Sequence, residues 1–246
     1  MDAVLADPDS LPPMPAGPPH GEEHFTASQT VRDLVIGTAD GLTVPFALAA
    51  GLSGAVAANA VIVTAGLAEI AAGCVAMGLG GFLAARTELD HYRNERRREA
   101  EETVLYPERE RWEVMAVFHR DGLRGPALQQ ATDAICADRE RWIDFMMRHE
   151  LELSAPDPAE APRSAVTIGG AYVAGGLVPL LPYVLLADTH AALQLSCVLT
   201  GLALLGFGWL KARAIGMPPL RSALQTALIG GLAAGVAYLV ARWVGS

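Results

Sequence analysis

Residues 66–104 read GLAEIAAGCVAMGLGGFLAARTELDHYRNERRREAEETV, and the character of this stretch changes sharply at Arg86. Before Arg86 the stretch is almost wholly apolar, with Glu69 as its one charged side chain, and beyond it most residues are charged or polar. Neither glycine nor proline interrupts residues 86–104, so nothing local ends a helix there. The stretch therefore predicts a membrane-spanning helix that continues without a break into a water-exposed domain.

Five segments of the chain are long and apolar enough to cross a membrane, since the hydrocarbon layer requires about 20 apolar residues in helical form. Hydrophobic residues make up 52% of the chain against 18% charged, and the mean hydropathy is +0.30. The segments are apolar on every side, not along one stripe, which favours a membrane over a soluble helical core. They are residues 34–56, 61–85, 165–187, 191–210 and 222–241.

Basic residues predict which side of the membrane each connection faces, because Lys and Arg concentrate in cytosolic loops. With a cytosolic N-terminus, all of the 18 basic residues except Arg242 lie inside. The first 28 residues are rich in proline and are predicted to form a disordered cytosolic tail. The predicted division is a tail at residues 1–28, spans 1 and 2 at 29–86, a cytosolic helical domain at 87–163, and spans 3 to 5 at 164–246.

The segment 87–163 has a helical pattern and predicts a three-helix bundle. The extension of the second span forms its first helix. Pro107 suits the first turn of a second helix that runs to about Arg120, and a third is predicted from Pro126 to about Leu153. The predicted fold class is thus an all-α integral membrane protein with five transmembrane helices and a cytosolic three-helix domain between spans 2 and 3.

Charge and cysteine content exclude several classes of function. A net charge of −9 argues against nucleic acid as a partner, since phosphate binding requires concentrated positive charge. Cys74, Cys136 and Cys197 show no CxxC spacing, so neither a disulfide framework nor a zinc ribbon is indicated. A cationic ligand fits the charge balance better.

Two carboxylates inside the predicted spans, Asp40 and Glu69, indicate an ion or proton path. An ionisable side chain within a span costs about 3 kcal/mol on insertion scales and is usually functional. The alternative is a protonated carboxyl bonded to a neighbouring helix. At about 1.5 Å per residue, Asp40, Met77 and Glu69 would form a ladder across the layer. Carboxylates with a thioether favour Fe²⁺ over Mg²⁺ or Ca²⁺, although methionine also serves as plain packing.

Glutamates in the cytosolic segment recur at i, i+3 spacing, which places each pair on one helical face. Helical bundles that bind di-iron centres use this interval on neighbouring helices. Arginines flank the same glutamates, so spacing alone supports a solvated salt-bridged surface equally well. The candidate metal ligands are Glu99, Glu102, Glu110 and Glu113 on the first two helices, with Met146, Met147 and Glu150 on the third.

Four longer strings resemble the vacuolar iron transporters: DGLTVPFALAAGLSGA from Asp40, GLAEIAAGCVAMGLGGFLA from Gly66, WIDFMMRHELEL from Trp142 and GGLVPLLPY from Gly175. The resemblance extends over nearly the whole chain after the tail. It implies five spans, a cytosolic three-helix metal-binding domain, and a homodimer with the transport path near its axis.

The same resemblance implies which residues bind metal. The family pattern E-x₂-E-x₇-E-x₂-E fits residues 99–113, and a following Met-Met-x₂-Glu element fits residues 146–150. The acidic residue of the first span, and the Glu and Met of the second, correspond to Asp40, Glu69 and Met77. The resemblance thus raises the metal cluster above the salt-bridged surface as the interpretation of the glutamates.

The implied function is transport of Fe²⁺, with Mn²⁺, Co²⁺ or Zn²⁺ as further candidates, out of the cytosol in exchange for protons. We therefore expect a secondary transporter and not an enzyme, with no prosthetic group, whose partners are divalent metal ions, protons, the lipid bilayer and a second copy of the chain. Abundant alanine, and arginine in place of lysine, favour a bacterial plasma membrane; a eukaryotic chain would lie in a vacuolar membrane.

Two alternative functions remain open at this point. A carboxylate-rich bundle can act as a membrane-bound di-iron oxidase, although such proteins carry a Glu-x-x-His motif on each of two helices and this chain has that spacing only once, at Glu88 and His91. The chain can also serve as a membrane metal sensor or buffer that binds metal without transporting it.

Overall fold

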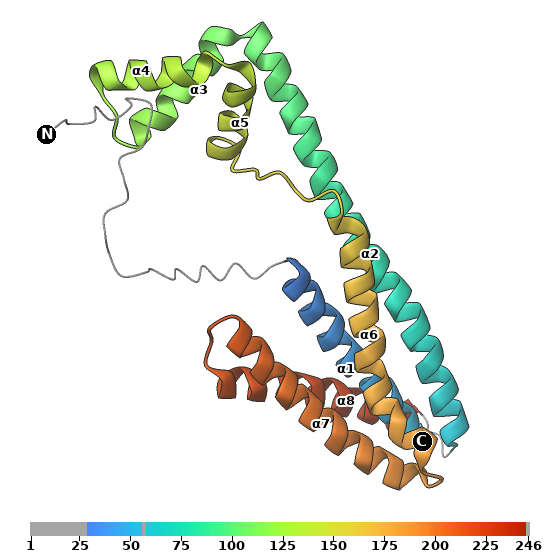
Figure 1. The fold of residues 1–246 in the computed structure, drawn as a ribbon. Coiled ribbons are helices and arrows are strands. Elements are labelled where there is room, and N and C mark those ends of the chain that lie inside the picture. The colour runs from blue at the N-terminus through green and yellow to red at the C-terminus, as the bar shows by residue number, and fades with distance from the viewer. Residues whose placement is uncertain (1–28, 56–57, 245–246) are drawn as a thin grey trace, which may run out of the picture.

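The computed structural model describes residues 29–55 and 58–244, and the predicted tail at residues 1–28 lies outside them. The described part of the chain is built from helices and their connections, without strands (Figure 1). In chain order the helices are α1 (Gln29–Ala55), α2 (Asn59–Leu105), α3 (Pro107–Arg120), α4 (Gly125–Cys136), α5 (Arg139–His149), α6 (Glu160–Leu185), α7 (Thr189–Ala214) and α8 (Pro219–Val244).

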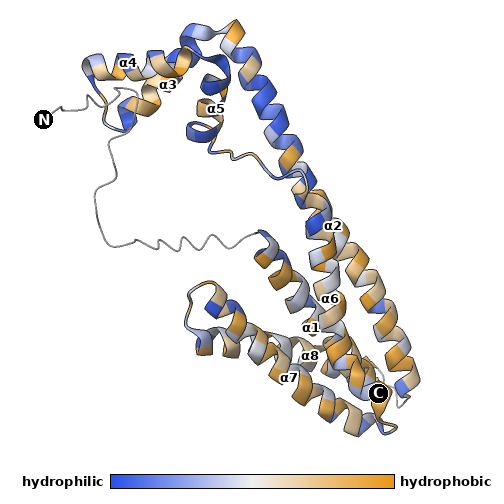
Figure 2. Ribbon diagram, in the orientation of Figure 1, coloured by the Kyte–Doolittle hydropathy of each residue, from blue (hydrophilic) through white to orange (hydrophobic). Residues whose placement is uncertain are grey.

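Five of these helices, α1, α2, α6, α7 and α8, are long and apolar enough to cross a membrane. Figure 2 shows them in largely hydrophobic colours, whereas the upper half of α2 and helices α3 and α5 are mostly hydrophilic. The spans coincide with the five predicted segments, and α3–α5 lie between the second and third. The predicted fold class is therefore confirmed.

Helix α2 connects the two parts of the molecule. It is 47 residues long, and at about 1.5 Å per residue it extends over roughly 70 Å, more than twice the thickness of a hydrocarbon core of about 30 Å. It ends where Tyr106 leaves the helical conformation, and Pro107, which has no N–H to lose, opens α3 in a new direction. The prediction of one uninterrupted helix followed by a second at Pro107 is confirmed.

The single helix predicted from Pro126 to Leu153 is wrong in detail, because two helices occupy this interval. Helix α4 ends at Cys136, and Asp138 adopts an extended conformation with φ −120° and ψ 121°. The carboxylate of Asp138 accepts a hydrogen bond from the backbone N–H of Arg141 at 2.8 Å, which caps the N-terminus of α5. The capping aspartate starts a new helix within a pattern that is helical on both sides.

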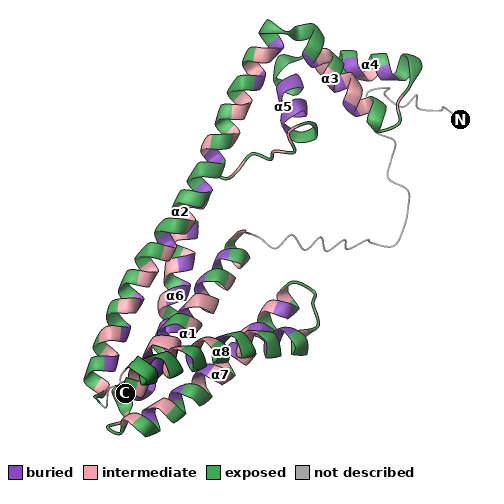
Figure 3. Cartoon of the chain, turned by 180° about the vertical axis from the view of Figure 1, so that it is seen from behind, coloured by how far each residue is buried: buried purple, intermediate pink, exposed green. Residues whose placement is uncertain are grey.

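Helix α6 is the central helix of the spans and packs against both α1 and α2. Small residues permit the close approach: a Cβ added to Gly73 of α2 would lie 2.5 Å from the ring of Tyr172, and one added to Gly41 of α1 would collide with its carbonyl oxygen. Tyr172 is thus held between α1 and α2. In contrast, little of the membrane portions of α2 and α8 is buried, and Figure 3 shows their outer faces exposed.

The part of the chain between the second and third spans has its own small core between α3 and α5, with Val114 and Val117 packed against Trp142, Phe145 and Met146. A pair of salt bridges also connects α5 to the extension of α2. In these, the guanidinium of Arg96 donates to the carboxylates of Asp144 and Glu140. Together these contacts fix α3 and α5 beside the upper part of α2, at a distance from the spans (Figure 1).

Candidate metal site and membrane path

Five of the predicted glutamates converge on one cavity of about 330 Å³ in the part of the molecule outside the spans. The corner at Tyr106 and Pro107 produces this arrangement, because it folds α3 back against α2 so that the two i, i+3 pairs face each other. The end of α5 adds the fifth glutamate. The carboxylates that line the cavity are those of Glu99, Glu102, Glu110, Glu113 and Glu150.

Three of these residues lie close enough to hold one ion. One carboxylate oxygen from each of Glu99, Glu102 and Glu110 lies within 4.8 Å of the other two. A first-row divalent metal with bonds of about 2.2 Å holds opposite ligands about 4.4 Å apart, so small side-chain rotations would close the group on an ion. Oε2 of Glu99 and Oε2 of Glu110 are buried and have no hydrogen-bond partner among the described residues. Buried acceptors without donors are costly, and a cation would satisfy them.

Burial and mutual repulsion raise the pKa values of carboxyl groups in the cavity. Loss of hydration raises the pKa of Glu99 to about 7, and the charges of Glu150 and Glu102 add to the effect. The pKa of Glu110 is also raised to about 7, first by burial and then by Glu113 and Glu99. The pKa of Glu150 is raised by the same two causes. A metal ion bound to these oxygens would therefore compete with protons near neutral pH.

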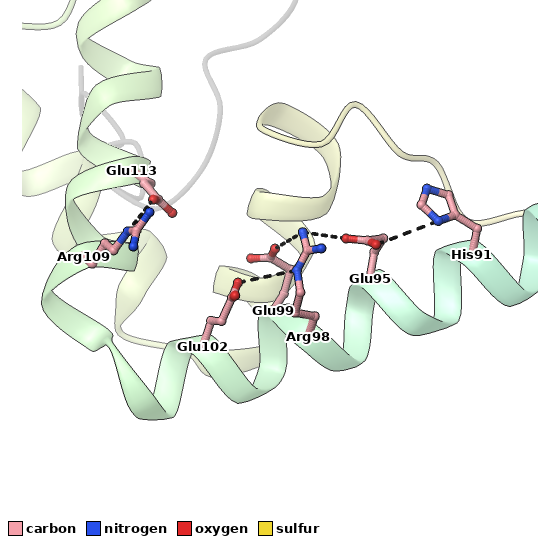
Figure 4. Close-up of polar contacts among 7 residues, drawn as sticks. All are labelled: His91, Glu95, Arg98, Glu99, Glu102, Arg109 and Glu113. Atoms are coloured by element: carbon pink, nitrogen blue, oxygen red, sulfur yellow. Dashed lines mark hydrogen bonds and ion pairs between the residues drawn. The ribbon is translucent and has the colours of Figure 1, made fainter.

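Two arginines lie among the glutamates, as Figure 4 shows. Nη2 of Arg98 lies 2.6 Å from Oε2 of Glu95, and Nε of the same side chain lies 3.8 Å from Oε2 of Glu102. Nε of Arg109 lies 3.3 Å from Oε1 of Glu113. Sequence reasoning treated the arginines and the metal cluster as alternatives, whereas the structure places both in one cavity.

The two predicted methionine ligands do not line this cavity. Met146 is fully buried in the apolar core between α3 and α5, and the side chain of Met147 is buried as well. Of the third-helix candidates, only Glu150, the residue at the C-terminus of α5, reaches the cavity lining. Among the described residues the structure therefore brings together the glutamates of the predicted set and leaves the thioethers in the core.

Within the spans, Glu69 on α2 has a partner that sequence reasoning missed. The hydroxyl of Tyr172 on α6 donates a hydrogen bond to Oε1 of Glu69, and Oε2 of Glu69 is buried with no partner in residues 29–55 and 58–244. The span of Tyr172 also carries the hydroxyls of Thr167 and Tyr183, so nothing in the sequence singled out Tyr172 as the partner of Glu69. Asp40 on α1 and Met77 on α2 are half-buried, and Asp40 directly precedes the glycine that contacts Tyr172.

The fold and the site define a multi-pass membrane protein with an acidic cavity outside the spans and isolated carboxylates within them. The sequence pattern of the VIT family matches residues 31–242, and the chain belongs to this family. It is 50% identical over 225 residues to vacuolar iron transporter 1 of Arabidopsis thaliana, and the aligned region covers 92% of this chain and 90% of the relative.

Further relatives support the same assignment. The chain is 49% identical over 225 residues to vacuolar iron transporter 1 of Oryza sativa subsp. japonica, with 92% of this chain and 89% of the relative covered. It is 34% identical over 238 residues to Protein CCC1 of Saccharomyces cerevisiae, with 88% and 70% covered. The family predicted from the four sequence strings is therefore confirmed.

Proposed function

We propose that this protein carries Fe²⁺ out of the cytosol in exchange for protons, as a secondary transporter and not as an enzyme. One observation carries the proposal: a single chain combines a buried carboxylate cavity outside the membrane with isolated carboxylates inside its spans. The names of the relatives, vacuolar iron transporters at about half identity over most of their length, support iron as the cargo.

The cytosolic domain, residues 87–163, would gather the metal between the spans of residues 29–86 and those of residues 164–246. Carboxylate oxygens replace part of the hydration shell of the ion, and crowding of like charges makes the exchange favourable. Met146 and Met147 would have to turn out of the core to add thioether ligands. The proposed ligands are Glu99, Glu102, Glu110, Glu113, Met146, Met147 and Glu150.

Within the membrane the ion would pass Asp40 and Met77 and then Glu69. Each carboxylate binds either a metal ion or a proton, so returning protons would neutralise the groups that the metal has left. Tyr172 supports this role for Glu69, because its hydroxyl orients one carboxylate oxygen and leaves the other available.

A homodimer is part of the proposal. The membrane portion of α2 exposes a broad apolar face that carries Val61, Leu67, Val75, Leu79 and Leu83, and a second copy packed there would bring two paths together. We place the protein in a bacterial plasma membrane, with residues 1–28 and 87–163 in the cytosol, from the composition and the distribution of basic residues. In a eukaryotic cell the corresponding site would be the vacuolar membrane.

The oxidase alternative is weakened by the position of the histidines. Di-iron bundles complete their sites with Glu-x-x-His pairs, and neither His91, His119 nor His149 lines the acidic cavity. The sensor alternative gives no role to Asp40 and Glu69 in the spans. Transport accounts for both groups of carboxylates.

Flux through reconstituted vesicles tests the proposal. Purified protein in liposomes, kept anaerobic, should quench a trapped Fe²⁺-sensitive dye faster than empty liposomes do, and an acidic lumen should accelerate the uptake. The same assay with Mn²⁺, Co²⁺ and Zn²⁺ would rank the cargo. Uptake no faster than in empty vesicles would exclude a transporter, and oxygen-dependent loss of Fe²⁺ without uptake would favour the oxidase.

A further inference from the structure

Arg98 occupies an unusual position at the edge of the acidic cavity. It lines the cavity together with the glutamates, and in Figure 4 its guanidinium lies between Glu102 and Glu99 on one side and Glu95 on the other. Its Nη2 lies 4.0 Å from Oε1 of Glu99, and its Nε lies 3.8 Å from Oε2 of Glu102. Both glutamates belong to the group of three whose oxygens are spaced to hold a metal ion.

A guanidinium and a divalent metal ion cannot both bind the same carboxylates at full strength. Both are cations, so they repel each other at these distances. An ion that binds Glu99 and Glu102 must therefore displace Arg98 or bind less tightly beside it. A monovalent cation that displaces Arg98 leaves the net charge of the cavity unchanged. A divalent ion adds one positive charge, which offsets more of the repulsion among the crowded carboxylates.

Glu95 offers Arg98 a place to which it can withdraw. The contact between Nη2 of Arg98 and Oε2 of Glu95, at 2.6 Å, is the shortest ion pair that Arg98 makes. Glu95 lies one turn before Glu99 on α2 and does not line the cavity. Its side chain is only 17% exposed, and Nδ1 of His91 lies 3.9 Å from its Oε1. The guanidinium can thus leave the cavity and keep a carboxylate partner.

We propose that Arg98 is a tethered counter-cation of the acidic cavity, which competes with metal for Glu99 and Glu102 and keeps only its pair with Glu95 when a divalent ion binds. Arg98 thereby sets the concentration at which the cavity fills and restricts it to multivalent cations. The inference rests on the proposed metal-gathering function of the cavity, and its test distinguishes the two.

The first comparison is between two neighbouring arginines in full-length protein purified in detergent. Arg98→Gln removes the competing charge, and Arg97→Gln removes the same charge about 100° around the helix, where Arg97 is exposed and bonds to Asn94. Mn²⁺, which is stable in air, is titrated by calorimetry. We expect Arg98→Gln to tighten Mn²⁺ binding by about three- to fivefold relative to Arg97→Gln. Equal affinities in the two variants would overturn the proposal.

A cycle with Glu95 tests the withdrawal of the guanidinium. Glu95→Gln should weaken Mn²⁺ binding in the native background, because Arg98 then has only the cavity carboxylates. The same substitution should have no effect on Mn²⁺ affinity when Arg98 is already glutamine. If Glu95→Gln acted only through a general loss of negative charge, it would weaken binding in that background as well. Glu101→Gln, at an exposed position of the same helix, is the matched control. An effect of Glu95→Gln that survives in the Arg98→Gln background contradicts the mechanism.

Two further variants separate the possible failures. Glu99→Gln with Glu110→Gln should abolish the Mn²⁺ binding of the cavity, and unchanged binding would overturn the proposed gathering function itself. Arg98→Lys keeps the charge and should keep near-native affinity, which makes the comparison usable if Arg98→Gln does not fold. If Arg98→Lys bound Mn²⁺ as tightly as is expected of Arg98→Gln, the proposal that the charge of Arg98 competes with metal would be overturned.

Discussion

The acidic cavity and the membrane path use the same functional group in opposite surroundings. In the cavity, five glutamates share one space with two arginines, so each charge is tuned by several others. In the spans, residues 34–85 contain only Asp40 and Glu69 and no basic residue, and the recorded partner of Glu69 is the neutral hydroxyl of Tyr172. In the proposed function, the first arrangement would distribute metal binding over many ligands, and the second would depend on single residues.

The cavity and the spans should respond differently to the loss of one carboxylate. In a crowded cavity, removal of one negative charge also relieves repulsion among the others, so part of the lost affinity is recovered. In the spans, residues 34–85 hold only the two carboxylates of Asp40 and Glu69, so fewer groups remain to take over the ion. A metal path should therefore tolerate substitutions in the cavity better than substitutions in the membrane.

The largest effect is expected from Glu69→Gln. This substitution keeps the size of the side chain but removes the negative charge that would bind the ion, and Fe²⁺ flux into proteoliposomes should fall by at least about tenfold, equivalent to about 1.4 kcal/mol. Glu113→Gln in the cavity should lower flux by only about twofold, since four carboxylates remain. Asp188→Asn is the control, because Asp188 caps α7 at the end of a span. Comparable losses for Glu69→Gln and Glu113→Gln would contradict the contrast.

A second prediction concerns the pH dependence of metal binding by the cavity. Glu99 and Glu110 have pKa values of about 7, so both are mostly ionised at pH 8 and mostly protonated at pH 6. Binding requires the ionised form, and affinity for Mn²⁺ should fall by about tenfold from pH 8 to pH 6 for each carboxylate that the metal uses.

Calorimetric titrations of full-length protein at pH 6, 7 and 8 measure this dependence. The neighbours that set these pKa values are Glu102, Glu113 and Glu150, which raise them, and Arg98, which lowers that of Glu99. In a Glu110→Gln variant the slope should decrease, because one titrating ligand is gone. An affinity that does not change over this range would show that the metal does not use Glu99 or Glu110.

The parts of the fold that follow from local properties could be predicted from the sequence. Hydropathy alone gave the five spans, and the lack of glycine and proline after Arg86 gave the long extension of α2. The break before α5 was missed because residues on both sides of Asp138 favour a helix, and only the cap of Asp138 marks the new start.

The site was predictable where it depends on spacing within one helix and not where it depends on packing between helices. The i, i+3 pairs placed Glu99 with Glu102 correctly on one face. Their approach to Glu110 depends on the corner at Tyr106, and the burial of Met146 depends on how α5 packs on α3. The contact of Tyr172 with Glu69 joins residues 103 positions apart, which no pattern in one sequence reveals.

The smallest effect is expected from Tyr172→Phe, which tests whether the path depends on a hydroxyl as well as on charge. The substitution keeps the ring that packs on Gly73 and removes the hydroxyl that donates to Oε1 of Glu69. A hydrogen bond of this kind contributes about 0.5–1.5 kcal/mol net, so Fe²⁺ flux should fall between about twofold and tenfold.

Tyr183→Phe is the matched control for this test, since Tyr183 is equally buried on the same helix and its hydroxyl pairs with Ser53 at 2.9 Å and not with a carboxylate. Flux should be close to native in this control. In the Glu69→Gln background, Tyr172→Phe should cause no further loss, because the carboxylate that the hydroxyl orients is already missing. An additional loss there would mean that Tyr172 acts on the ion, or on α1 and α2, independently of Glu69.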